Sequence, residues 1–152
     1  MKRLITSDDV LRLAYSSSEL LPSTIVLDVD IIEAECRHVA PVLGKELVER
    51  LEAGEYEALM NNYVAPAIAL WTRYGVEQVA YHRSAACHDE RPTAADNERL
   101  RTTLRALSEK ASTLTRRLSD HLNAHGDDYP EYDPIKNPLN RCFIYGNIVE
   151  IL

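Results

Sequence analysis

Apolar residues recur three and four positions apart over most of the chain, and this spacing predicts α-helices. The first helix is expected over residues 7–15. Thr6 can cap it, because Asp9 stands three residues later and completes the pattern of a capping box. The stretch that follows, residues 16–23, is rich in serine and contains a proline, which predicts a loop.

A second helix is expected over residues 29–40, with Asp28 as its N-cap. Pro41 should interrupt this helix, and the residues after it should turn the chain. A third helix follows over residues 45–53 and should end at Gly54. The apolar face predicted for the second helix consists of Val29, Ile32, Cys36, Val39 and Leu43.

The fourth and fifth helices are the longest that the pattern predicts. The fourth, over residues 55–88, is apolar around most of its circumference, which is typical of a central helix, and Pro66 should kink or split it. The fifth, over residues 94–124, begins at a second capping-box pair, Thr93 and Asp96. It carries an apolar seam with heptad spacing, made of Leu100, Leu104, Leu107, Ala111, Leu114 and Leu118.

The chain changes character after Gly126. Residues 127–138 contain three prolines and four acidic residues, which predicts an extended, non-helical connector. Two apolar runs, residues 141–145 and 148–152, then flank Gly146-Asn147, which is the pattern of a β-hairpin. A hairpin that is apolar on both faces should pack on its own helices or on a partner, because a lone hairpin is marginally stable in water.

These elements predict an all-α fold, an elongated bundle of about five helices with two long antiparallel helices and a short C-terminal extended tail or β-hairpin. We expect residues 1–126 to form the helical domain, and residues 127–152 the proline-containing acidic connector and apolar tail. A helix of about 30 residues is about 45 Å long, whereas a globule of this length has a radius of gyration of about 15 Å. The molecule should therefore be elongated.

Composition narrows the class of protein. The chain has 152 residues, of which 45% are apolar and 27% charged, as in an ordinary globular domain. Its formal net charge of −7 argues against a general binder of nucleic acid or anionic membranes, which needs a basic surface. The charge is also uneven. Residues 28–57 hold nine acidic and three basic residues, whereas residues 92–126 hold four acidic and six basic residues.

Motifs for catalysis or metal binding are sparse. Glu35 and His38 form one Glu-x-x-His, but a di-iron bundle needs two. His121 and His125 share a helix face, as zinc ligands do, although histidines at a helix end need no metal to explain them. The Cys-His-Asp-Glu run at residues 87–90 is expected to be a helix end. We therefore expect no enzymatic activity, no cofactor and no metal site, with His121 and His125 as the only metal candidates.

The heptad seam could join two copies of the chain. Its flanking cations, Arg101, Lys110 and Arg117, would meet their like in a parallel pair, so we expect the fifth helix to pack antiparallel to the fourth. Its basic edge should then lie near Glu46, Glu49, Glu52, Glu55 and Glu57. Contacts between subunits are expected to use seam leucines and the apolar tail, namely Leu100, Leu104, Leu107, Leu114, Leu118, Phe143, Ile144, Tyr145, Ile148, Val149 and Ile151.

The order of elements around residues 32–51 resembles a known group of proteins. Ile32-Glu33-Ala34-Glu35-Cys36 leads through Val39-Ala40-Pro41-Val42-Leu43-Gly44 into a short helix with Leu47 and Leu51, and a long hydrophobic helix follows. This order resembles the head–tail connector (adaptor) proteins of tailed bacteriophages, and more closely the uncharacterised prophage proteins allied to them. The resemblance spans about residues 25–125. The long fifth helix and the extension over residues 127–152 depart from the shorter members.

The resemblance implies a non-enzymatic structural protein of the virion, a subunit of a ring between the portal and the tail. Its partners would be further copies of itself and portal and tail proteins, with no sequence-specific nucleic acid and no membrane. Its location would be the bacterial cytoplasm during assembly, and then the virion. Two alternatives stay open from the residues alone: a helical protein-binding or regulatory module of unrelated origin, and a metal-binding helical protein.

Overall fold

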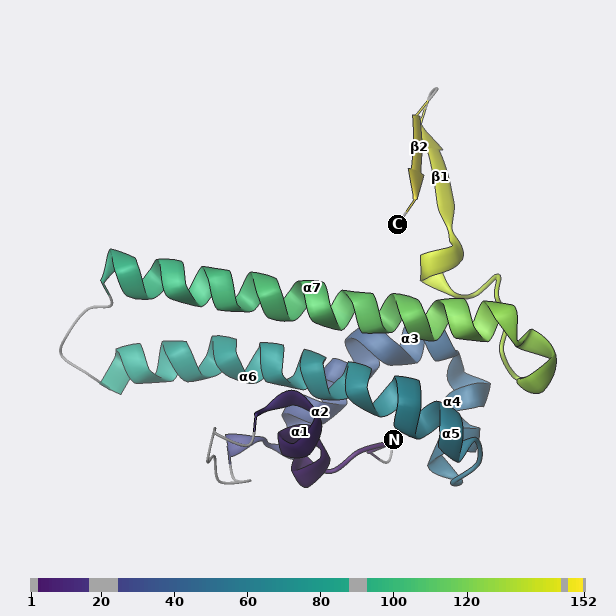
Figure 1. Ribbon diagram of the computed structural model, residues 1–152, viewed down its shortest axis with the longest axis horizontal. Helices are drawn as coiled ribbons and strands as arrows, with labels where there is room; N and C mark the ends of the chain where they lie inside the picture. The colour runs from purple at the N-terminus through teal and green to yellow at the C-terminus, as the bar shows by residue number, and fades with distance from the viewer. Residues whose placement is uncertain (1–2, 17–24, 88–92, 146–147, 152) are drawn as a thin grey trace.

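The computed structural model shows an elongated all-α bundle built along two long antiparallel helices, α6 (Ala65–Cys87) and α7 (Ala94–Ala124) (Figure 1). Helices α1 (Ser7–Ala14) and α2 (Asp28–Ala34) pack against α6. The structure describes residues 3–16, 25–87, 93–145 and 148–151, and it describes residues 80–87, 142–145 and 148–151 by their backbone alone. The fold class and the pairing of the two long helices are as predicted.

Shorter elements complete the chain. They are η2 (Glu35–Val39), α3 (Ala40–Leu43), α4 (Lys45–Glu52), α5 (Glu57–Leu59), η3 (Met60–Val64), η4 (Gly126–Asp128), η5 (Pro138–Asn140), β1 (Cys142–Tyr145) and β2 (Ile148–Ile151). The turns η2 and η3 are π-helical, whereas η4 and η5 are 3-10 turns. The segments α2, η2 and α3 follow one another without a break, as do α5, η3 and α6.

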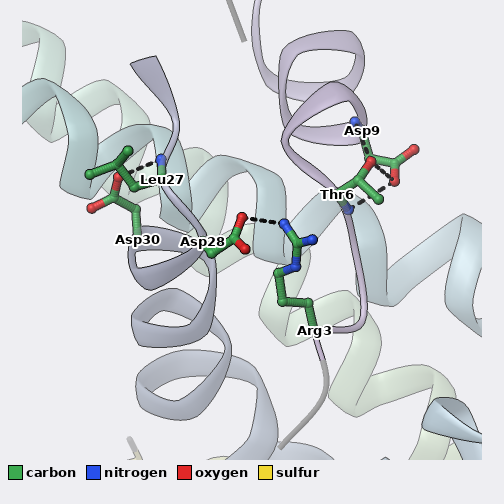
Figure 2. A network of polar contacts seen from close by, with 6 residues as sticks. All are labelled: Arg3, Thr6, Asp9, Leu27, Asp28 and Asp30. Carbon is green, nitrogen blue, oxygen red and sulfur yellow. Dashed lines mark hydrogen bonds and ion pairs between the residues drawn. The ribbon is translucent and has the colours of Figure 1, made fainter. Parts of the chain in front are cut away.

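Side chains cap the helix starts that the sequence indicated. Thr6 and Asp9 form the capping box of α1, and Thr93 and Asp96 form that of α7, so both predictions are confirmed (Figure 2 shows the first). The second helix differs from the expectation. Its cap is Leu27, whose N–H donates to Asp30 at 3.0 Å, and Asp28 is the first helical residue. Asp28 pairs instead with the Arg3 guanidinium (Figure 2).

Two prolines are accommodated in the same way. Pro41 and Pro66 each stand two residues beyond the end of a π-helical turn, η2 and η3 respectively. A proline ring collides with the carbonyl four residues before it and supplies no N–H, and a wider turn at that carbonyl relieves both problems. The expected interruption at Pro41 is therefore wrong. The helix continues to Leu43, and the chain turns at Gly44, which has a φ of +80°.

The buried face of this helix differs from the one predicted. Val29, which was expected on the apolar face, lies before η2 and is 62% exposed, and Cys36 within η2 is exposed as well. A π turn adds about one residue to the helical repeat, so the apolar stripe after it is shifted by one position relative to an α-helix. The residues that the helix buries are Ile31, Ala34, Glu35, Val39, Val42 and Leu43.

The centre of the bundle lies around the first half of α6. Val64, Ala67, Ile68 and Ala69 are all buried, so this part of the helix has protein on nearly every side, as predicted for a central helix. The helix that leads into it begins at Glu57 and not at residue 55. Gly54 has a φ of +86° and Tyr56 a φ of +56°, and these left-handed conformations break the helix between α4 and α5.

The basic edge of α7 was predicted to lie near the glutamates of residues 46–57, but two of these glutamates pair with cations of their own region. Glu49 pairs with Lys45 of its own helix, and Glu55 pairs with Arg50. Arg50 also pairs with Glu131 of the tail at 2.9 Å. The acidic face of α4 is thus partly neutralised within its own region of the chain.

The acidic connector is folded and not extended. Tyr132 and Asn137 are buried, and Asn137 donates to Ser119 Oγ of α7 and to the hydroxyl of Tyr132, both at 2.8 Å. The prediction of an extended segment fails because buried polar side chains tie this segment to α7. The strands β1 and β2 form the predicted antiparallel hairpin, with Tyr145 opposite Ile148, and the hairpin projects from the bundle (Figure 1). None of the described helices is long and apolar enough to span a membrane.

Candidate docking site

A stacked pair of rings, His38 and Trp71, lies where η2 packs against α6. The ring centroids are 3.7 Å apart and the planes are within 5° of parallel. Two further contacts hold the indole. Its Nε1 donates to Thr115 Oγ1 of α7 at 3.0 Å, and the ring of Tyr74 packs edge-on against it with centroids 5.7 Å apart. Three segments of the fold therefore fix the orientation of one tryptophan.

Two hollows adjoin this pair, and both include Arg37, His38 and Trp71 in their walls. The smaller hollow, of about 150 Å³, is completed by Asp30, Glu33, Ala34, Tyr74, Gly75, Gln78 and Val79. The larger hollow has a volume of about 280 Å³ and is completed by Pro41, Val42, Ser112, Thr115, Arg116, Pro138 and Leu139. We call the larger hollow the Trp71 cleft.

The Trp71 cleft combines apolar walls with two cations. Arg37 and Arg116 are both exposed, and none of the residues that line this cleft is acidic. The Arg37 guanidinium lies 3.0 Å from the Glu33 carboxylate on the exposed side of the helix. Tryptophan and arginine beside apolar surface are the residues most enriched at the centres of protein interfaces. The arrangement suits a partner that offers an apolar side chain next to a carboxylate.

The electrostatics of the stacked pair favour a neutral imidazole. Burial lowers the pKa of His38 most, and the positive charge of Arg37 lowers it further, against a smaller opposing effect of Glu33. A histidine whose pKa is lower in the folded state contributes stability above its unfolded pKa. That contribution is lost as the pH falls from the unfolded to the folded pKa. The stack should therefore be intact at neutral pH and weaken on acidification.

Trp71 is the only tryptophan of the chain, so its fluorescence should report this titration. An imidazolium quenches an adjacent indole more strongly than an imidazole does. We expect the emission to fall on acidification with a midpoint below about 6.5, the ordinary pKa of histidine. His38→Gln should abolish the change, whereas His121→Gln, at a different stacked site, should leave it in place. A midpoint at or above the ordinary value would contradict the burial of the ring.

Glu35, the other half of the Glu-x-x-His motif, faces the interior and not the cleft. Its side chain is fully buried, its Oε2 accepts from the N–H of Leu4 at 3.2 Å, and its Oε1 has no partner among the described residues. Because these two residues belong to a π turn, the three-residue spacing does not place them on one face. Burial raises the pKa of Glu35, and the neighbouring Glu52 raises it further.

Glu35→Gln should stabilise the protein at about pH 8. When the pKa of a carboxyl is raised in the folded state, the protein loses stability as the pH rises from the unfolded pKa to the folded pKa. The reason is that burying the charged carboxylate is costly. The glutamine keeps an acceptor for Leu4 N–H, so we expect a gain on the order of 1 kcal/mol that shrinks toward about pH 5. Urea unfolding at several pH values measures the difference. The exposed Glu46→Gln is the control, and a gain independent of pH would refute the explanation.

The two candidate metal ligands are engaged with neighbouring groups. The rings of His121 and His125 stack with centroids 4.4 Å apart, and Tyr63 stacks on His121 at 4.3 Å. His121 Nε2 lies 3.1 Å from the Tyr129 hydroxyl, and His125 Nδ1 lies 3.0 Å from the carbonyl oxygen of His121. The part of the chain that the structure describes contains no group of three or more His, Cys, Asp or Glu residues placed to hold a metal. The predicted Cys-His-Asp-Glu run extends outside the described residues.

The residues expected at subunit contacts lie in three different settings. Leu107 and Leu118 are buried inside the chain, where Leu118 belongs to the main core. Their side chains are therefore covered by their own subunit and offer no surface to a partner. Leu100, Leu104 and Leu114 are half-buried along the same seam. The side chains of Phe143, Ile144, Tyr145, Ile148, Val149 and Ile151 lie outside the described residues.

Sequence reasoning missed the Trp71 cleft. Trp71 lies within the fourth helix that the sequence predicts over residues 55–88, and nothing in the pattern joins it to η2 or to the connector. Pro138 and Leu139 reach the cleft because the connector folds back onto α7. The one available signal was the presence of a single tryptophan, and that signal does not say which residues surround it.

Comparison with known proteins gives a family without an assigned activity. A family model described as a family of unknown function (DUF6712) matches residues 39–141, about two thirds of the chain. The matched segment runs from the last residue of η2 to the residue before β1 and includes most of the lining of the Trp71 cleft. No curated protein and no solved structure matches the chain.

Proposed function

The chain belongs to the DUF6712 family, and we propose that it is a structural protein of virion assembly, a head–tail connector (adaptor) subunit of a phage or prophage. The observation that carries the proposal is the architecture. A short helix leads through the turn at Gly44 to α4 and then to the long hydrophobic α6, and this is the order of elements that resembles those connectors. The partners proposed are further copies of the chain and the portal and tail proteins.

The form of the molecule supports an assembly role. The pair α6 and α7 extends beyond the other helices, and the hairpin projects from the bundle (Figure 1). Residues 93–99 at the start of α7 are exposed. A lone two-stranded hairpin is marginally stable in water, so a projecting hairpin favours contact with a neighbour. Both features offer surface to other proteins at a distance from the core.

The chemistry of the surface supports docking better than catalysis. The Trp71 cleft joins an indole, apolar walls and two guanidinium groups, and these groups recognise side chains of a protein partner. The acidic excess over residues 28–57, which include α4, fits a position beside a DNA channel, because a negative wall lets a polyanion pass without binding it. Glu46 and Glu49 are exposed on that helix.

Deletion of the gene from a phage or an inducible prophage that carries it tests the proposal. Without the connector we expect DNA-filled heads and separate tails in electron micrographs of the lysate, and a loss of infectious particles. Supplying the gene in trans should restore complete virions. Complete virions in normal number from the deletion strain would refute the proposal, as would a gene that lies apart from portal, capsid and tail genes.

A further inference from the structure

A turn closed by hydrogen bonds holds the side chain of Ile135 in the solvent. Ile135 is 83% exposed, the highest value among the large apolar residues whose side chains the structure describes. Its N–H donates to Asp133 Oδ1 at 3.0 Å, the Lys136 N–H donates to the carbonyl of Asp133 at 3.1 Å, and the Asn140 amide donates to the carbonyl of Pro134 at 2.9 Å. These bonds fix the turn, so Ile135 is displayed at little further cost in conformational entropy. We call residues 133–136 the Ile135 knob.

The Trp71 cleft has the size and the charge to receive such a knob. Its volume of about 280 Å³ exceeds the roughly 150 Å³ of an apolar cavity that holds benzene. Arg37 and Arg116 border the cleft without an acidic residue among the lining. Residues 127–136, which include the knob, contain four carboxylates and one cation, Lys136, so this segment keeps a negative balance although Lys136 pairs with Asp133 and Arg50 pairs with Glu131. The knob of the same chain does not fill the cleft, because Ile135 is exposed.

We propose that the Ile135 knob of one copy of this chain docks into the Trp71 cleft of the next copy. Ile135 then packs against Trp71, Val42 and Leu139, and the acidic tail lies against the guanidinium groups of Arg37 and Arg116. The occupant is a second copy because the complementary surface, an apolar knob beside carboxylates, is present on the chain itself. Both surfaces also fall almost entirely within the segment that the family model matches.

The contact joins two different surfaces, so a pair held by one such contact keeps one free knob on one subunit and one free cleft on the other. Such a head-to-tail contact produces a ring when the rotation between neighbours closes, and a filament when it does not. This inference rests on the proposed function in that it names the surface between neighbouring ring subunits. The contact itself is testable on the isolated protein.

Sedimentation velocity from micromolar to near-millimolar concentration tests the contact. The wild-type chain should form species larger than a dimer as the concentration rises. Ile135→Ser removes the knob and Arg116→Glu reverses a charge beside the cleft. Each should weaken association on the order of tenfold to a hundredfold.

Both positions are exposed, so the fold of each variant should be unchanged, and circular dichroism checks this. Val29→Ser, at another highly exposed aliphatic position, is the matched control and should associate as the wild type does.

Mixing the two variants separates this contact from a symmetric one. The Ile135→Ser chain keeps its cleft and the Arg116→Glu chain keeps its knob, so the mixture should give a one-to-one heterodimer and nothing longer. Absence of that heterodimer overturns the proposal, as does a wild-type chain that stays monomeric throughout. Association lost with Arg116→Glu but kept with Ile135→Ser would place a different segment in the cleft and overturn it too.

The outcomes also separate this inference from the proposed function. Rings that form equally well from the Ile135→Ser chain would refute the contact and leave the connector role standing. Association that depends on Ile135, together with normal virions from a deletion strain, would support the contact and refute the connector role.

Discussion

Leu118→Ala should lower the free energy of unfolding by about 3 to 5 kcal/mol. Leu118 has no exposed surface and belongs to the core that α7 shares with α6. Truncation removes apolar contacts and leaves a cavity that helices packed on both sides cannot close. Urea unfolding followed by circular dichroism measures the change, and the midpoint should fall with the slope unchanged.

Leu100→Ala is the matched control, since it changes the same residue type in the same seam. Leu100 is half-buried near the start of α7, where the neighbouring residues 93–99 are exposed. We expect a cost of about 1 kcal/mol or less, because a partly exposed site buries less surface and leaves no enclosed cavity. Equal costs at the two positions would mean that the seam is covered along its whole length, as in a dimer formed through α7.

Asn137→Ala should destabilise the chain by about 2 to 4 kcal/mol and release the tail from α7 first. Asn137 is 1% exposed, and its amide donates to Ser119 and Tyr132 while its oxygen accepts from Leu139 N–H at 3.0 Å. Each of the three bonds contributes about 1 kcal/mol, and two of the partners left behind, Ser119 and Tyr132, are themselves buried. Hydrogen exchange should accelerate over residues 126–141 before it does so in α6.

A variant at an exposed asparagine shows whether burial is the cause. Asn61→Ala removes the same amide from the surface of η3 and should change stability by no more than about 0.5 kcal/mol. If Asn137→Ala left exchange in the tail unchanged, the hydrogen bonds of Asn137 would not be what holds the connector on α7. The docking of the knob would then need another support, because its turn belongs to the same segment.

Local signals in the sequence predicted some of the helix ends, although not the cap of α2 or the start of α5. Thr93 with Asp96 placed the start of α7 at the observed residue, and the heptad leucines identified the side of α7 that meets α6. Gly54 was correctly read as the C′ residue that follows the C-cap of α4, Ala53. Each of these features depends on residues within about one helical turn, and their chemistry is the same whatever the rest of the chain does.

The features that required contacts across the chain were missed. The apolar face predicted for the second helix did not include Glu35, yet Glu35 is buried and accepts a hydrogen bond from the N–H of Leu4. The connector was predicted to be extended because it is acidic and rich in proline. In the structure Tyr132 and Asn137 are buried, and Asn137 bonds to Ser119 of α7 and to Tyr132. No local pattern shows which buried group will find a partner distant in the sequence.

The shared placement of the two prolines has a consequence for the history of the family. A π turn is an α-helical turn with one residue inserted, and here each insertion is matched to a proline two residues beyond its end. Losing the proline alone removes the reason for the wide turn, and losing the inserted residue alone restores the steric clash. In an alignment of family members, a gap of one residue within positions 35–39 or 60–64 should therefore coincide with replacement of Pro41 or Pro66. The inserted residue of each π turn and the proline that follows it should therefore be kept or lost together among family members.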